Sequence, residues 1–163
     1  SKNETFDCLI YFKKRDLKEL KLVENFMKER NLTFNILEYG KYKQKELLRL
    51  AKNSKFGLVL DKTESQGFAI QYLMSENLPL IVLDYPVNFD ESFEISGTSV
   101  PYWTEKLCGI KVNSIEELEN NFDKFFKNIE KYSPVEYVLK TLTYEVFEKN
   151  ILSYFEDDKL WST

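Results

Sequence analysis

Histidine is absent from this sequence of 163 residues, and cysteine occurs only twice. Without histidine, the chain cannot build Ser-His-Asp or Cys-His nucleophile systems or most zinc sites, so no metal site is predicted. Cys8 and Cys108 lie far apart and lack the spacing of metal ligands. Cys8 belongs to an apolar run, which predicts a buried thiol without a disulfide and fits a reducing compartment.

Excess positive charge and long apolar runs are absent as well. The 23 basic and 27 acidic residues give a net charge of -4. This balance argues against nonspecific nucleic-acid binding but leaves room for a local basic pocket. No stretch approaches the roughly 18 apolar residues that a membrane span needs, and no signal peptide is visible. We therefore expect a cytoplasmic protein with no nucleic-acid partner and no membrane span.

The composition that is present is typical of a globular protein. Apolar residues make up 43% of the chain and charged residues 31%, as in ordinary soluble domains. A chain of 163 residues is long enough for one domain with a real core. We expect residues 1–163 to form a single domain, with residues 156–163 as a loose tail.

Apolar periodicity predicts strands and helices that alternate along the chain. The predicted strands are 6–12, 33–37, 56–60, 80–83 and 109–112. The predicted helices are 16–30, 44–52, 68–75, 114–131, one that opens at Ser133-Pro134, and 143–155. The stretch 84–108 is expected to be a long irregular loop. This order predicts an α/β fold, a Rossmann-like open parallel sheet of about five strands with helices on both faces and C-terminal helices.

In an open parallel sheet, ligands bind beyond the carboxyl ends of the strands. Lys13, Lys14 and Arg15 follow the first predicted strand, Gly40 follows the second, and the segment 61–67 follows the third. A helix N-terminus beside basic side chains suits phosphate, so we expect a phosphorylated ligand at this edge. The alternative is that the basic residues form a solvated turn and that the Ser and Thr residues simply cap the helix.

The segment ESQGFAIQYLMSENLPLIVLD, which begins at Glu64, resembles the donor-binding signature in the C-terminal half of GT-B glycosyltransferases. That signature has a Glu, seven residues and a second Glu, followed by a small residue, a Pro and an aliphatic strand. The later segments GTSVPYWTEKLCGIKVNSIEEL and SPVEYVLKTLTYEVFEKNIL resemble the closing portion of such domains. The resemblance covers most of the chain from about Lys55 to Phe155.

The resemblance implies roles for the residues of the turn and the helix start. Glu64 would contact the transferred sugar, and the backbone N–H groups of Gln66, Gly67 and Phe68 would hold the diphosphate. Gly67 also suits this role physically, because glycine lets the backbone approach a ligand closely. We expect Ser65, in the same turn, to contact the substrate as well.

The resemblance also implies that basic residues after the first strand neutralise the diphosphate and stabilise it as the leaving group. Arg15 is the first candidate for this role, with Lys14 or Lys13 assisting. Gly40, after the second strand, is expected to line the substrate site. The second Glu of the signature holds the ribose hydroxyls in that family, and Tyr72 stands in its place here. Nucleotide affinity is therefore weaker, or ribose recognition lies elsewhere.

The function that the resemblance implies is that of a glycosyltransferase or its donor-binding domain. It would bind a nucleotide-diphosphate sugar and transfer the sugar to an acceptor with retention, without a cofactor. GT-B enzymes have two Rossmann-like domains, so a separate acceptor-binding domain or a second copy of the chain is an expected partner. One alternative is a noncatalytic glycosyltransferase-like binding or partner module. A weaker alternative is a receiver-type signalling domain with Asp61 as phospho-acceptor, because Lys13 and Lys14 would repel the metal that such a domain needs.

Two apolar features have two interpretations each. Tyr102 or Trp103 either stacks on the ligand or covers the core. The apolar stripe within 143–155 either docks on the chain's own sheet or faces another domain or chain. Finally, Glu64→Ala is expected to weaken ligand binding with little loss of stability, because Glu64 is predicted to lie on a surface turn.

Overall fold

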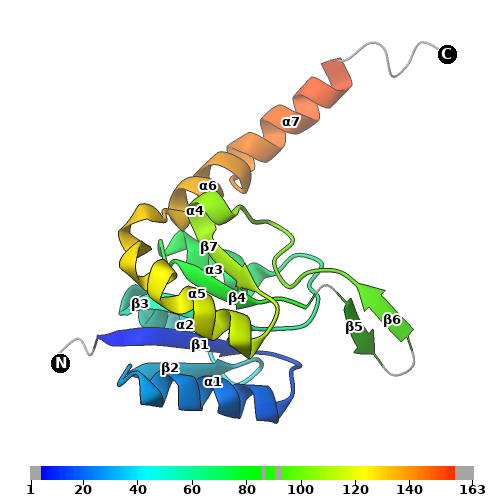
Figure 1. The fold of residues 1–163 in the computed structure, drawn as a ribbon. Helices are drawn as coiled ribbons and strands as arrows, with labels where there is room; N and C mark the ends of the chain where they lie inside the picture. Colours follow the sequence, from blue (N-terminus) through cyan, green and yellow to red (C-terminus); the bar gives the residue numbers. More distant parts are fainter. Residues whose placement is uncertain (1–4, 86, 91–92, 157–163) are drawn as a thin grey trace.

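The computed structural model describes residues 5–85, 87–90 and 93–156. Its centre is an all-parallel sheet of five strands in the order β2-β1-β3-β4-β7 (Figure 1). These strands are β1 (Phe6–Phe12), β2 (Phe34–Glu38), β3 (Ser54–Leu60), β4 (Leu80–Leu83) and β7 (Gly109–Val112). The predicted Rossmann-like α/β fold is confirmed, and each predicted strand lies in this sheet.

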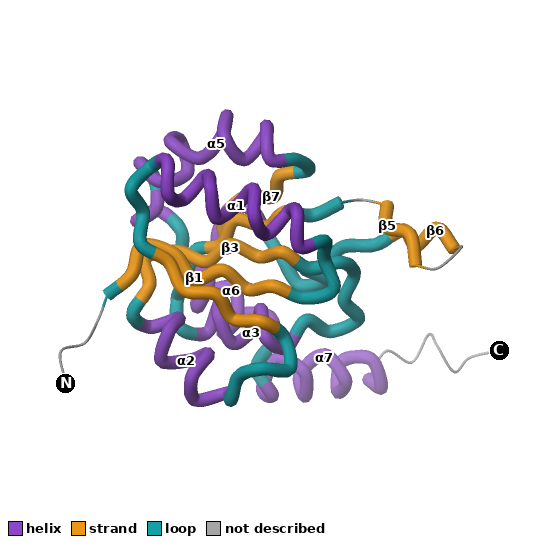
Figure 2. Tube along the Cα trace, turned by 90° about the horizontal axis from the view of Figure 1, so that it is seen from below, coloured by secondary structure: helices purple, strands orange, loops and turns teal. Residues whose placement is uncertain are grey.

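Helices cover both faces of the sheet, as Figure 2 shows. Helices α1 (Leu17–Glu29) and α5 (Ile115–Lys127) lie on one face. Helices α2 (Gln44–Lys52), α3 (Phe68–Ser75) and α6 (Pro134–Thr141) lie on the other. The predicted helix 114–131 is divided, because α5 ends at Lys127 and a short 3-10 helix, η1 (Ile129–Lys131), follows.

The alternation of side chains in β1 explains the two layers. Cys8, Ile10 and Phe12 pack toward α1 and α5, whereas Leu9 and Tyr11 pack toward α2 and α3. All five are buried, as expected for a central strand of a parallel sheet that is covered on both faces. The burial of the Cys8 thiol is therefore confirmed. The same alternation decides which side chains just beyond the carboxyl ends of the strands face each helical layer.

Polar side chains start several of the helices where the sequence predicts them. The Asp16 carboxylate accepts a hydrogen bond from the N–H of Lys18 at 2.8 Å, and Ser114 Oγ accepts one from the N–H of Glu117 at 3.0 Å. Both contacts satisfy backbone donors that have no partner within the helix. Pro134 occupies the first turn of α6, where its missing N–H costs nothing.

The stretch 84–108 is not the irregular loop that the sequence predicts. It contains an antiparallel hairpin of β5 (Val87–Asp90) and β6 (Phe93–Ser96), which projects from the body in Figure 1, and the short helix α4 (Glu105–Cys108). Apolar and polar residues alternate in both hairpin strands, VNFD and FEIS. This period of two indicates strands, but each run is short enough to be missed.

The last helix, α7 (Tyr144–Glu156), extends away from the sheet (Figure 1). Tyr144 is 73% exposed and Phe147 is 60% exposed, so the stripe as far as Leu152 does not dock on the chain's own sheet. The side chains of Tyr154 and Phe155 lie outside the described residues. The tail that we expect to be loose lies outside the described residues beyond Glu156.

Candidate functional site

A cavity of about 400 Å³ opens at the carboxyl ends of β1 and β3. The strand order changes direction between these two strands, and such switch points are where open α/β sheets bind ligands. Helices α2 and α3 flank the cavity. Aromatic side chains dominate its walls, so we name it the aromatic cavity; they are Tyr11, Tyr39, Tyr42, Phe68 and Tyr72.

Most of the predicted site residues line this cavity. Those that do are Lys13, Glu64, Ser65, Gln66, Gly67, Phe68 and Tyr72. Those that do not are Lys14, Arg15 and Gly40. Alternation explains the difference at the end of β1, because Lys13 continues the face of Leu9 and Tyr11. Lys14 is exposed and turns the chain with a φ of 51°.

Helix α3 points its N-terminus into the cavity without a side-chain cap. Its N-cap is Gly67, which adopts the left-handed conformation with φ 65° and ψ 41°. The N–H groups of the first helical turn have no partner within the helix and carry partial positive charge. The alternative that Ser or Thr side chains simply cap this helix is therefore wrong. The start of the helix remains open to a ligand.

Lys13 lies between two carboxylates at the inner end of the cavity. Its ammonium group contacts the carboxylate of Glu64 and lies 4.0 Å from Oδ2 of Asp61. It also lies 4.5 Å from the centre of the Tyr39 ring. The side chains of Lys13 and Glu64 are only 12% and 16% exposed. Neither belongs to a solvated turn, and the predicted surface position of Glu64 is wrong.

Asp61, considered from the sequence only as the phospho-acceptor of the receiver-type alternative, also lines the aromatic cavity. It is 1% exposed, and its Oδ1 accepts the N–H of Lys62 at 2.8 Å. Its Oδ2 has no hydrogen-bond partner among the described residues. Burial raises the pKa of Asp61 to about 6, although nearby Lys13 acts in the opposite direction. Side-chain alternation in β3 could have predicted its position in the cavity. Asp61 comes two residues after Val59 and therefore points to the same side of the sheet.

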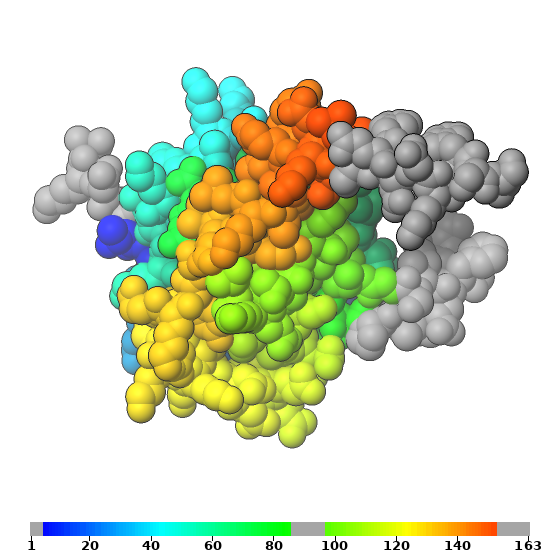
Figure 3. Space-filling view, turned by 90° about the horizontal axis from the view of Figure 1, so that it is seen from above, coloured from blue at the N-terminus to red at the C-terminus, as the bar shows by residue number. Residues whose placement is uncertain are grey.

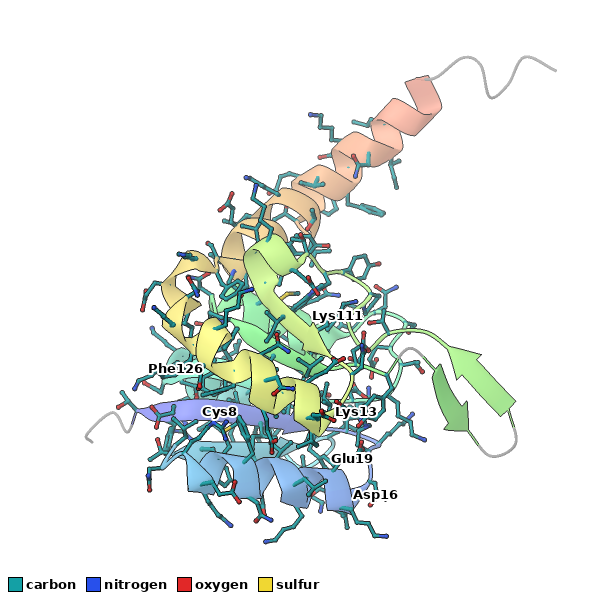
Figure 4. All side chains as sticks on the ribbon, viewed as in Figure 1. Cys8, Lys13, Asp16, Glu19, Lys111 and Phe126 are labelled. Carbon is teal, nitrogen blue, oxygen red and sulfur yellow. The ribbon has the colours of Figure 1, made fainter. Side chains whose placement is uncertain are left out.

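Arg15 is held inside the protein and is 3% exposed. Its Nε and Nη2 donate to both oxygens of Glu19 at 2.8 and 2.7 Å. Its Nη1 donates to the carbonyls of Asp61 and Leu83 at 2.9 and 3.0 Å. The guanidinium therefore ties the carboxyl ends of β3 and β4 together, and Figure 4 places Lys13 and Glu19 at this same end.

Tyr85 completes the enclosure of Arg15. Its ring lies 3.9 Å from the guanidinium, and its hydroxyl donates to Glu19 at 2.6 Å. Burial alone would raise the pKa of Glu19, but the hydrogen bonds from Arg15 and Tyr85 outweigh it and hold the pKa below its usual value. Glu19 therefore stays ionised and keeps Arg15 in place.

A loop after the hairpin braces the rim of the cavity. Asp84 accepts hydrogen bonds from the Thr98 hydroxyl and from the N–H of Ser99, the latter at 2.9 Å. The carbonyl of Thr98 in turn accepts the N–H of Glu64 at 3.1 Å. Tyr102 donates its hydroxyl to Gln66 at 3.3 Å. Trp103 packs against the core beside α2 and α3, which agrees with the core interpretation for this residue.

No protein-family model matches this chain, and no curated protein matches it. Within the described residues, none of the helices is both long and apolar enough to cross a membrane.

Proposed function

We propose that the chain is the donor-binding domain of a glycosyltransferase, which binds a nucleotide-diphosphate sugar in the aromatic cavity and transfers the sugar with retention. The observation that carries this proposal is the open N-terminus of α3, which faces a cavity that also holds Lys13 and Glu64. A volume of about 400 Å³ lies within the range of small-molecule sites.

The diphosphate binds the start of α3 in this proposal. The N–H groups of Phe68 and Ala69 belong to the first helical turn, and such groups bind phosphate oxygens well. Lys13 supplies the positive charge that offsets the diphosphate. Because Lys13 already contacts Glu64, the diphosphate competes with this carboxylate for the ammonium group.

This competition releases Glu64 for the sugar. A carboxylate that has lost its lysine partner accepts hydrogen bonds from sugar hydroxyls. Oδ2 of Asp61 lacks a hydrogen-bond partner among the described residues, and it accepts a hydrogen bond from another hydroxyl of the sugar. Arg15 does not touch the ligand in this proposal, because its guanidinium is already bound to Glu19 and to two backbone carbonyls.

The aromatic walls supply the surface for the base. Phe68 and Tyr72 are exposed on α3, and Tyr39 is exposed across the cavity. A planar base stacks on such rings, and stacking contributes about 1–3 kcal/mol per base in nucleic-acid complexes. Tyr72 offers a ring and one hydroxyl in place of a carboxylate, so we expect the base to matter more for affinity than the ribose hydroxyls.

A noncatalytic binding module is the second candidate. The observation that favours it is the position of Arg15, which leaves Lys13 as the cation of the described cavity lining. One ammonium group offsets less of the charge on a leaving diphosphate than a lysine and an arginine together. Such a module would bind the donor but release no nucleoside diphosphate from it.

Calorimetric titration with a panel of nucleotide-diphosphate sugars tests the proposal. We expect one of them to bind, and Glu64→Gln to weaken that donor at least about tenfold relative to the matching nucleoside diphosphate, because the charged acceptor for the sugar hydroxyls is lost. Glu46→Gln on α2 is the matched control, because Glu46 is exposed and does not line the cavity. Failure of every donor to bind, or equal losses in both variants, would reject it. Release of nucleoside diphosphate then separates the enzyme from the module.

A further inference from the structure

A second hollow, of about 610 Å³, opens on another part of the molecule. It lies between α4, β7, the second half of α5 and η1, and shares no lining residue with the aromatic cavity. Figure 3 shows the chain around residues 105–112, in green, beside the yellow segment that contains α5 and η1. We name it the lysine groove after Lys106, Lys111, Lys124 and Lys131.

The charge of the lysine groove is opposite to that of the whole chain. Four lysines line it, and Glu105 is the acidic residue of its lining, whereas the chain has a net charge of -4. Several like charges around a hollow with protein walls create a positive potential that concentrates anions. The local charge therefore selects an anionic ligand.

Three of these lysines form no ion pair with the residues that the structure describes, although Lys106 contributes, after Lys140, to the lowered pKa of Glu136. Lys106, Lys124 and Lys131 have no carboxylate oxygen within 4.0 Å among the residues that the structure describes. Lys111 is the exception, because it lies 3.6 Å from Oδ2 of Asp84. Ammonium groups without protein partners keep their donors available for a ligand, and each offers three.

The floor of the lysine groove is rigid. Phe125 is buried and stacks on Tyr132 with ring centres 5.3 Å apart. Phe125 also packs edge-on against Phe56 of the core. The four lysines come from four separate elements around this fixed floor, so their ammonium groups can converge on one ligand. A concave site of this volume fits a small molecule better than a flat membrane surface.

We propose that the lysine groove binds a soluble small molecule with several phosphate charges. Phosphate oxygens would accept hydrogen bonds from Lys106, Lys124 and Lys131, and the partly exposed ring of Tyr132 would pack against the less polar part of the ligand. This site is independent of the aromatic cavity, so it stands whether or not the donor-binding proposal holds.

The test uses tripolyphosphate as the probe, titrated into the full chain at physiological ionic strength. We expect binding that the double variant Lys124→Gln/Lys131→Gln weakens at least about tenfold, since two charged hydrogen bonds are lost. The double variant Lys18→Gln/Lys28→Gln on α1 changes the net charge equally, and we expect it to keep wild-type affinity. The loss caused by Lys124→Gln/Lys131→Gln should persist when Lys13→Gln is added, because Lys13 lines the aromatic cavity and not the lysine groove.

Amide chemical-shift mapping of the wild-type chain gives a second readout that needs no variant. We expect tripolyphosphate to shift the amide signals around Asn121 and Asn128, which line the groove. The proposal is overturned if the probe does not bind, if the α1 variant loses as much affinity, or if no shifts occur around Asn121 and Asn128. Lysine-dependent sedimentation with anionic vesicles, without binding of soluble probe, would assign the groove to a membrane surface instead and equally overturn it.

Discussion

Asp61 is a residue whose burial makes stability depend on pH. Burial raises its pKa to about 6, from 3.8 in a solvated chain. Between these two values the folded chain binds the proton more strongly than the unfolded chain does. The free energy of unfolding therefore falls as the pH rises through this window. Above the window, the whole cost of burying the ionised carboxylate is present.

We predict that Asp61→Asn raises the free energy of unfolding at pH 7.5 by about 1–3 kcal/mol, because the charge is no longer buried. The gain should fade as the pH is lowered through this window and below 3.8, toward about 3, where Asp61 is largely protonated in both states. Urea denaturation at the two pH values measures both effects. A loss of stability at pH 7.5 would show that the carboxylate is better satisfied than its surroundings indicate.

Arg15 is predicted to stabilise the fold. Arg15→Gln leaves Glu19 buried without its cation and leaves two backbone carbonyls without their donor, so we expect a loss of about 2–4 kcal/mol. Lys14→Gln is the control, because Lys14 is exposed and should change stability by no more than about 0.5 kcal/mol. Similar unfolding curves for the two variants would contradict this role for Arg15.

Among the elements, α3 begins at Gly67, whose left-handed conformation suits glycine. Gly67→Ala should cost about 1–2 kcal/mol, because φ is 65° there and an alanine pays for the left-handed conformation. An added Cβ would lie 3.6 Å from the nearest atoms, so strain rather than a clash sets the cost. Thermal unfolding measures the loss, and a more stable variant would contradict the prediction.

Gly40→Ala separates this strain from an effect on the site. Gly40 has a φ of 80° and nothing within 4 Å of an added Cβ, and it does not line the aromatic cavity. We expect both alanine variants to lose similar stability, but only Gly67→Ala to weaken donor binding. Equal weakening of binding by the two variants would mean that general destabilisation is responsible.

The sequence predicts a helix well where apolar periodicity ends at a polar boundary. The bounds of α2 and α3 match those predicted, because apolar residues at helical spacing end at clear polar boundaries. The hairpin was not predicted, because each of its strands has four residues, too few for alternation to stand out from a loop. The division of the predicted helix 114–131 at Asn128 carries no Gly or Pro signal.

At the scale of the whole molecule, the sheet and the edge at which the cavity opens could be predicted, because buried parallel strands read as continuous apolar runs. The distribution of charge at that edge could not. Lys13, Lys14 and Arg15 are adjacent in sequence, yet one faces the cavity, one faces solvent and one binds Glu19. That outcome depends on the turn at Lys14 and on carboxylates from distant segments.

Amide chemical-shift mapping with a nucleotide-diphosphate sugar at saturating concentration is the most direct test of donor binding at the start of α3. We expect the signals of Gly67, Phe68 and Ala69 to shift strongly, because their N–H groups would bind the diphosphate. No shift at the start of α3, or shifts confined to other parts of the chain, would contradict it.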